Sequence, residues 1–293
     1  MPDNNLSSLS PFEGRPIVLR TVPASMGLWW LKRGWALLKI HPWDSHMAVL
    51  FFLGALSICA ILPWIGSLFA VALMPALYVG VMAVFAQHAA ELNRSAPDTG
   101  LPSSAKTIAP RNIFTPLTAV FKSPTALRQL VVLGFVCGAS VFAMIGAYAL
   151  IDGGTAFNYV VLGDALPKEP EARAQAIVNM AGVLVFYAPI SLAFWFTQLL
   201  VGWHGQSVLK SIFFSWVACW RNLGAFTVFG LAWAGVYFLT SGALVLLTMI
   251  LGIPHLLAML IFPLSVFLMV WTFACFYASY ESLVGLGDIA PVE

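Results

Sequence analysis

Residues 41–46, His-Pro-Trp-Asp-Ser-His, form the densest cluster of side chains that could carry chemistry. Two imidazoles and a carboxylate this close together could ligate a metal ion. The same residue types also suit the start of a membrane span, because Asp44 or Ser45 can cap a helix and Trp43 can anchor it at the membrane interface. Pro42 would end the preceding helix. We expect this capping role, so the sequence predicts no metal site and no cofactor.

A second group of polar residues falls at the ends of three apolar segments. Its members are Gln87, His88, Glu91, Gln198, His204, Gln206, Tyr277, Ser279, Tyr280 and Glu281. These residues could converge on a shared polar vestibule, or they could be ordinary residues at the level of the lipid headgroups. An enzyme acting on lipid would need His88, Glu91 and His204 to meet the 41–46 cluster. The sequence contains no familiar catalytic, nucleotide-binding or zinc motif, so we predict no catalytic residue.

Three amphipathic segments, at about 28–40, 116–122 and 207–221, each precede a pair of apolar segments. An amphipathic helix lies in the headgroup layer, where its cations meet lipid phosphates. The cations that we expect to contact headgroups are Lys32, Arg33, Lys39, Lys122, Lys210 and Arg221. Anionic membrane lipid is therefore the predicted partner.

The apolar stripes of the first and third amphipathic segments follow helical spacing. They consist of Leu28, Leu31, Trp35 and Leu38 in the first, and of Leu209, Ile212, Phe213, Trp216 and Trp220 in the third. Each segment ends in a large apolar residue, a cation and a helix-breaking or capping residue. The pattern suggests a threefold internal repeat of one helix followed by a helical hairpin. Chance similarity between membrane sequences is the alternative.

The second apolar segment of each pair contains an internal proline, at Pro75, Pro189 and Pro263. Proline removes one backbone hydrogen bond and kinks a helix. The kinks could simply shape packing, or they could expose carbonyl groups that bind a substrate. Gly134 and Gly138 form a GxxxG pair, for which we favour close packing inside the bundle over dimerisation.

The composition excludes a water-soluble globule. Of the 293 residues, 60% are hydrophobic and 9% are charged, and the mean hydropathy is +0.90. Soluble domains average about 25% charged residues. Lipid must therefore cover much of the exterior. The net charge of +2 indicates no nucleic-acid partner.

Six segments are long and apolar enough to cross a bilayer, which needs about 20 residues per helix. We place them at about 47–64, 67–90, 127–151, 177–203, 223–251 and 253–280. The predicted fold is all-α and polytopic, with cytoplasmic-face amphipathic helices and a single six-helix membrane domain over 25–285. Residues 1–24 are expected to form a flexible cytoplasmic tail, and 286–293 a C-terminal tail. The first two spans share a tight turn at residues 63–66, which read Pro-Trp-Ile-Gly.

Basic residues are distributed unevenly across these spans. All but two of the 14 Lys and Arg fall before the first span, between the second and third, or between the fourth and fifth, which all lie on the same side of the membrane. The exceptions, Lys168 and Arg173, lie among acidic residues between the third and fourth spans. The positive-inside rule therefore predicts that both termini are cytoplasmic.

The order of these features is similar to that of a known group of proteins. Residues 34–43 read GWALLKIHPW, Pro63 and Pro75 lie in the first hairpin, and the pairs 210–211 and 221–222 read Lys-Ser and Arg-Asn. At these positions, and over about 24–285, the chain resembles uncharacterised proteobacterial inner-membrane proteins. The resemblance implies a multi-span fold in the bacterial inner (plasma) membrane, and it carries no assigned activity.

Three functions remain open from the sequence. The leading one is a non-enzymatic scaffold, accessory subunit or lipid-interacting protein, because no charged residue lies near the middle of a predicted span. A membrane-protein partner or a second copy of the chain would then be further partners. The first alternative is a transporter or channel for a small neutral or amphipathic solute, with a central cavity lined by the proline-bearing helices. The second is a membrane enzyme acting on lipid.

Overall fold

The computed structural model describes residues 17–62, 65–94 and 112–284, and within these ranges it contains helices and no strand. Six stretches there are long and apolar enough to cross a membrane, which confirms the predicted all-α, six-span class. They are α2 (Pro42–Ala60), α3 (Ile65–Arg94), α5 (Pro124–Asp152), α7 (Pro170–Phe194) continued by α8 (Thr197–His204), α10 (Leu223–Leu251) and α11 (Pro254–Leu283). The C-terminal tail at 286–293 and residues 1–16 lie outside the described residues, as do residues 63–64 of the predicted turn. The other two residues of that turn, Ile65 and Gly66, are already part of α3.

The spans begin where the sequence supplies helix-starting residues. Proline occupies the first turn of α2, α5 and α11, where its missing N–H is not needed and its fixed φ suits a helix. Ser123 caps α5 by accepting a hydrogen bond from the Ala126 amide at 3.4 Å. The first span therefore starts at Pro42, about one turn before the start that the sequence predicts, at about residue 47.

Short helices precede three of the spans. They are α1 (Met26–Ile40) before α2, α4 (Phe114–Ala119) with η2 (Val120–Lys122) before α5, and α9 (Val208–Arg221) before α10. The connection between α5 and α7 contains α6 (Thr155–Phe157) and η3 (Asn158–Leu162). Its turns use glycines with positive φ, such as Gly153 at 68° and Gly163 at 74°.

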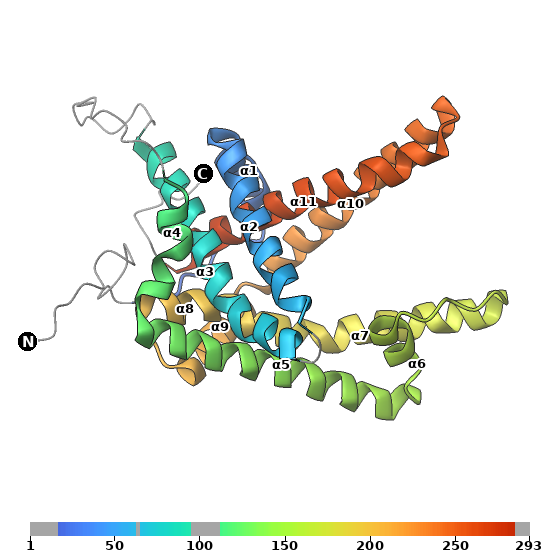
Figure 1. Cartoon of the computed structure of the whole chain (residues 1–293), viewed down its shortest axis with the longest axis horizontal. Helices are drawn as coiled ribbons and strands as arrows, with labels where there is room; N and C mark the ends of the chain where they lie inside the picture. Colours follow the sequence, from blue (N-terminus) through green and yellow to red (C-terminus); the bar gives the residue numbers. More distant parts are fainter. Residues whose placement is uncertain (1–16, 63–64, 95–111, 285–293) are drawn as a thin grey trace, which may run out of the picture.

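The best-packed region lies where the short helices meet one end of the long ones (Figure 1). Its largest fully buried side chains include Trp30 of α1, Phe85 of α3, Phe196 between α7 and α8, and Tyr280 of α11. We call this region the hub. The far ends of α5, α7, α10 and α11 extend away from it and expose large apolar side chains; Phe238 is 80% exposed. Lipid is the medium that can cover such surfaces.

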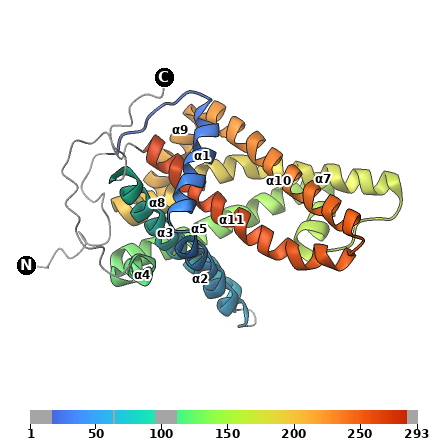
Figure 2. The ribbon, with the colours of Figure 1, turned by 90° about the horizontal axis from the view of Figure 1, so that it is seen from above.

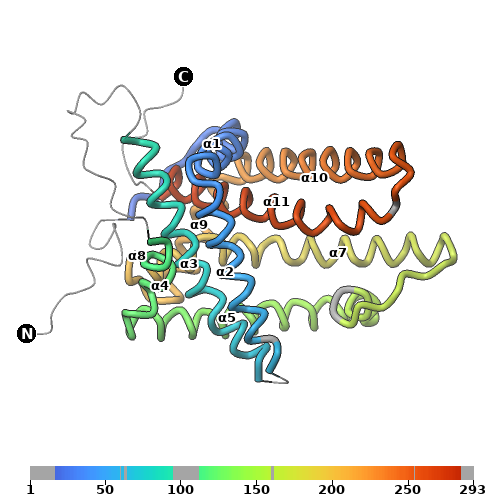
Figure 3. The backbone as a smooth tube through the Cα atoms, turned by 45° about the horizontal axis from the view of Figure 1, so that its top comes forward, coloured from blue at the N-terminus to red at the C-terminus, as the bar shows by residue number. Residues whose placement is uncertain are grey.

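The hairpins leave the hub in different directions. In Figure 3, α2 and α3 run across the line followed by α5, α7, α10 and α11, and in Figure 2 α2 also points away from α10 and α11. Each short helix packs on a hairpin other than the one that directly follows it in the chain. α4 packs on α3, α9 packs on α7 and α8, and α1 packs on α10 and α11. The contacts therefore form a closed ring around the hub.

The sequence predicts that α1 lies in the lipid headgroup layer, but in the structure it packs closely against α10 and α11. A Cβ atom on Gly27 would lie 2.6 Å from the Phe229 amide nitrogen, and one on Gly34 would lie 2.8 Å from that of Cys275. Glycine therefore lets the α1 backbone approach α10 and α11. This corrects the predicted stripe. Leu28 and Trp35 are exposed, because the buried face follows the two glycines rather than the largest apolar residues.

Residues 17–24, which the sequence placed in a tail, pack against the hub without forming a helix. The Arg20 amide donates to the Leu283 carbonyl at 2.9 Å. The Asn222 side chain accepts from the Val22 amide at 2.8 Å and donates to the Arg20 carbonyl at 3.0 Å. These bonds tie the segment to the junction of α9 and α10 and to the end of α11.

Candidate lipid-contact surface and polar hub

A charged hydrogen-bond cluster in the hub joins three helices. Arg33 of α1 donates from Nε and a terminal nitrogen to the two carboxylate oxygens of Glu281 in α11, at 3.1 and 3.0 Å. The same terminal nitrogen donates to Asn93 Oδ1 of α3 at 2.7 Å. A planar guanidinium matches a carboxylate in this two-bond geometry. Arg33 therefore holds α1, α3 and α11 together.

This pairing corrects one predicted lipid contact. The side chains of Arg33 and Glu281 are only 16% and 10% exposed. The Arg33 guanidinium therefore pairs with a carboxylate of the protein and not with a lipid phosphate. Lys32, Lys39, Lys122, Lys210 and Arg221 are exposed, and they remain candidates for contact with headgroups.

Other polar residues from the span ends also meet in the hub. His204 Nε2 of α8 lies 2.6 Å from the Tyr280 hydroxyl of α11. Trp30 Nε1 donates to the Ser282 hydroxyl at 2.8 Å. Tyr280 and Ser282 are almost fully buried. At these residues the span ends meet in a packed, hydrogen-bonded core. This differs from both readings of the sequence, an open polar vestibule and ordinary residues at the level of the lipid headgroups.

The 41–46 cluster meets the end of α3. His41 Nε2 lies 3.1 Å from each carboxylate oxygen of Glu91, and the Ser45 hydroxyl lies 3.4 Å from His88 Nδ1. The His41 and His88 rings are 5.5 Å apart. In the part of the chain that the structure describes, no three His, Cys, Asp or Glu are grouped so as to hold a metal ion. His204, which a lipid enzyme would need here, has its Nε2 within 2.6 Å of the Tyr280 hydroxyl of α11.

Helix α9 presents its large apolar residues outward. Leu209, Phe213 and Trp220 are 79%, 62% and 58% exposed, whereas Ser211 and Ser215 are fully buried. Small residues on the inner face allow close packing on α7 and α8. The outer face would be unfavourable in water and favourable in lipid. The basic residues Lys210 and Arg221 lie near its two ends.

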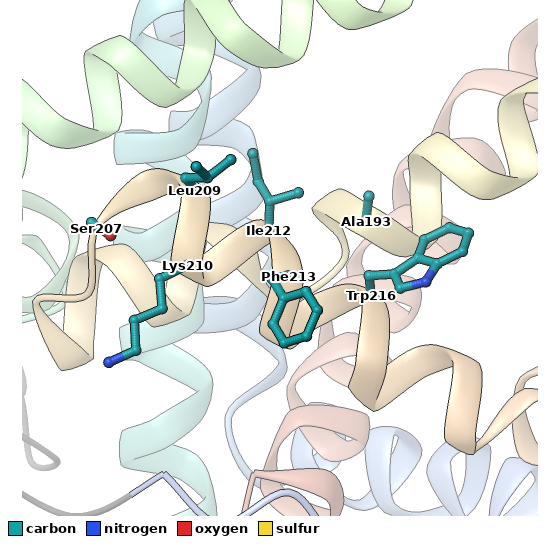
Figure 4. A pocket seen from close by; sticks show the side chains of 7 residues that line it. All are labelled: Ala193, Ser207, Leu209, Lys210, Ile212, Phe213 and Trp216. Carbon is teal, nitrogen blue, oxygen red and sulfur yellow. The ribbon is translucent and has the colours of Figure 1, made fainter.

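A groove follows this outer face (Figure 4). It has a volume of about 660 Å³, and α9 lines it together with Ala193 near the end of α7. The lining is apolar except at one end, where Ser207 and Lys210 lie. The Lys210 ammonium is 5.6 Å from the centre of the Phe214 ring, and Figure 4 shows its side chain directed away from Trp216. The groove thus combines an apolar surface with a cationic end.

The break between α7 and α8 is occupied by a side chain from α9. The Ser215 hydroxyl donates to the Leu192 carbonyl at 3.0 Å and accepts from the Phe196 amide at 3.0 Å. In an uninterrupted helix these two backbone groups would bond to each other. A hydroxyl inserted in this way breaks a helix. One turn further along α9, burial raises the pKa of the Cys219 thiol, although its contact with Ser215 acts in the opposite direction.

The three internal prolines have different surroundings. Pro75 is buried within α3, whereas Pro189 in α7 and Pro263 in α11 are exposed. The break in the fourth span comes after Pro189, at residues 195–196. Two of its freed backbone groups, the Leu192 carbonyl and the Phe196 amide, bond to Ser215.

The GxxxG pair faces a neighbouring helix of the same chain. A Cβ on Gly134 would lie 2.9 Å from the Ala72 carbonyl oxygen, and one on Gly138 would lie 2.7 Å from Val71 Cγ1. Gly134 and Gly138 therefore allow α5 to approach α3. A similar contact lies between α3 and α4, where a Cβ on Gly80 would meet the backbone of Leu117. Close approach through glycine is a recurring feature of this fold.

Sequence reasoning missed the Arg33–Glu281 pair and the inserted Ser215. The spacing of seven residues between Gly27 and Gly34 was the available signal for a tightly packed α1, because it puts both glycines on one helical face. Nothing comparable pointed to Ser215. Serine is common at helix surfaces, and its partner groups are backbone atoms 19 and 23 residues away in the chain.

The comparisons with known proteins agree with a membrane location. No protein-family profile matches the chain, and no solved structure matches it. A probable inner membrane protein of Burkholderia thailandensis is 30% identical over 276 residues, which cover 91% of this chain and 94% of the relative. Together with the six candidate spans, this relationship shows that the chain belongs to the same family of multi-span bacterial inner membrane proteins.

Proposed function

We propose that this protein is a non-enzymatic, lipid-interacting protein of the inner membrane, which binds anionic phospholipid along α9. The outward apolar face of α9 is the observation that carries the proposal. An acyl chain would lie in the α7–α9 groove, and the phosphate would contact Lys210. Both termini would be on the cytoplasmic side, where anionic lipid attracts basic residues.

The energetics favour this arrangement. Full burial of one large apolar side chain contributes about 1.5–3 kcal/mol, and α9 exposes Leu209, Phe213 and Trp220 on one surface. A basic residue near an anionic surface adds about 1 kcal/mol. Lys210 and Arg221 are available because both are exposed. The groove and its cationic end therefore match the two parts of a phospholipid.

The alternatives have weaker support. Transport through broken helices is not favoured, because Ser215 occupies the break between α7 and α8. The short contact of His204 is with Tyr280 of α11, which gives no support to a catalytic site on lipid at the 41–46 cluster. The exposed apolar ends of the hairpins are compatible with a scaffold role, in which a membrane-protein partner or a second copy of the chain would replace lipid.

The proposal is tested by titrating phosphatidylglycerol onto the detergent-purified protein and resolving the bound states by native mass spectrometry. The double variant Lys210→Gln with Arg221→Gln should bind the lipid roughly tenfold or more weakly, from about 1 kcal/mol for each lost cation. Lys168→Gln, a change of the same type in the connection before α7, should bind as the parent does. Equal binding by the parent and the double variant would show that α9 is not the site of anionic lipid.

A further inference from the structure

A second groove lies between α2 and α11, on helices that do not form the α9 site. Pro42, Trp43, His46 and Leu50 of α2 line one wall, and Pro263 and Val266 of α11 are among those that line the other. The volume is about 590 Å³, which falls within the roughly 300–1,000 Å³ of small-molecule sites. No Lys, Arg, Asp or Glu is among its lining residues. A charged ligand would therefore lose its hydration without gaining a counter-charge.

His46 is the polar side chain of this groove, and its hydrogen bonding fixes which ring nitrogen carries a proton. His46 Nδ1 lies 2.7 Å from the Pro42 carbonyl oxygen. A carbonyl oxygen only accepts hydrogen bonds, so Nδ1 must be the donor. In the neutral imidazole the other nitrogen, Nε2, is then an acceptor. The ring is further held by stacking on Phe267, with centroids 6.1 Å apart and an interplanar angle of 28°.

Pro263 lies on the opposite wall of the groove, within α11. Because proline has no N–H, it cannot donate to the carbonyl of Met259, four residues earlier in α11. That carbonyl lies one helical turn from the groove-lining Pro263. His46 is thus the one polar side chain among the lining residues, and the rest of the lining is apolar or aromatic and carries no charged group.

We infer that the α2–α11 groove binds a neutral lipid that carries a hydroxyl group, with the hydroxyl donating to His46 Nε2 and the acyl chain lying against Leu50 and Val266. The His46 acceptor matches the hydroxyl of such a lipid, and the uncharged apolar lining matches its acyl chain. Trp43, which is 77% exposed, flanks the His46 end. This site is independent of the anionic-lipid site on α9.

A matched pair of ligands tests the hydrogen bond on the unaltered protein. Dioctanoylglycerol has a free hydroxyl, and in its acetylated triester a small acetyl ester replaces that donor. In native mass spectrometry of the detergent-purified protein, dioctanoylglycerol should bind roughly fivefold more tightly, the order expected for one neutral hydrogen bond. Equal affinity for the two ligands would overturn the inference.

Three variants locate the site. His46→Phe keeps an aromatic ring beside Phe267 but removes the acceptor, so it should bind both ligands as weakly as the parent binds the triester. His255→Phe, which changes an exposed histidine outside the groove, should keep the parent's preference. Leu50→Trp should fill the groove and weaken binding of both ligands at least fivefold. A preserved preference in His46→Phe, or unchanged binding in Leu50→Trp, would contradict the assignment.

Binding of phosphatidylglycerol distinguishes this inference from the proposed function. His46→Phe and Leu50→Trp should bind that anionic lipid as the parent does, because the α9 groove is unchanged. Their normal binding would also show that both variants are folded. Loss of anionic-lipid binding in both would mean that the two grooves are not separate sites and would overturn the inference.

Discussion

Individual polar residues in this protein act mainly by joining helices to one another. Arg33 connects α1, α3 and α11 through Glu281 and Asn93, and Ser215 connects α9 to the break between α7 and α8. Buried polar groups are costly without partners and strong when fully paired. These residues were not predictable as partners, because charge and polarity in the sequence do not show which distant helix supplies the other half of a bond.

The Arg33–Glu281 pair leads to a stability prediction. Arg33→Ala leaves the Glu281 carboxylate without its bidentate partner, and we expect a loss of about 2 kcal/mol. This is less than the roughly 3–5 kcal/mol of a fully buried pair, because the two side chains keep 16% and 10% exposure. Thermal unfolding of the detergent-purified protein measures the effect. Lys32→Ala, at the exposed neighbouring position, is the control and should change stability little; equal stability of the two variants would contradict a structural role for Arg33.

At the scale of elements, the number of spans was predictable and their packing faces were not. Long apolar runs mark spans directly, because only they can cross a bilayer. The inner faces of α1 and α9 follow small residues, Gly27 and Gly34 in one and Ser211 and Ser215 in the other. Large apolar residues are equally stable against lipid and against protein, so an apolar stripe does not identify the buried side of a membrane helix.

Glycine packing of α1 gives a prediction about the element. Gly34→Ala would place a methyl group 2.8 Å from the Cys275 amide nitrogen, and we expect it to cost about 1–3 kcal/mol through overpacking. Gly54→Ala in α2 meets nothing within 4 Å and should be neutral or stabilising by up to about 1 kcal/mol. Thermal unfolding of the two variants side by side checks this. A Gly34→Ala variant as stable as Gly54→Ala would show that α1 does not approach α11 so closely.

The whole molecule consists of three hairpins that diverge from one packed hub (Figure 1). The order of a short helix followed by a hairpin was visible in the sequence. The ring of contacts was not, because it pairs α1 with helices more than 180 residues later in the chain. Most large buried side chains lie in the hub, so the far ends of the hairpins depend on lipid or on a partner for coverage.

The membrane orientation is a prediction at this scale. A reporter enzyme that is active only outside the cytoplasm should be inactive when fused after Glu293 and active when inserted at Gly163, in the connection between η3 and α7. The basic residues on the hub side predict this orientation through the positive-inside rule. Activity of the C-terminal fusion together with inactivity of the Gly163 insertion would show the opposite orientation.

The most direct measurement of the central proposal is an experimental structure of the protein in nanodiscs that contain phosphatidylglycerol. We predict elongated density along Leu209, Phe213 and Trp216 in the α7–α9 groove, with a headgroup beside Lys210. Density of this kind should be weaker in nanodiscs made of zwitterionic lipid alone. A groove without ordered lipid in both membranes, or an α9 whose outer face is covered by protein, would contradict the account.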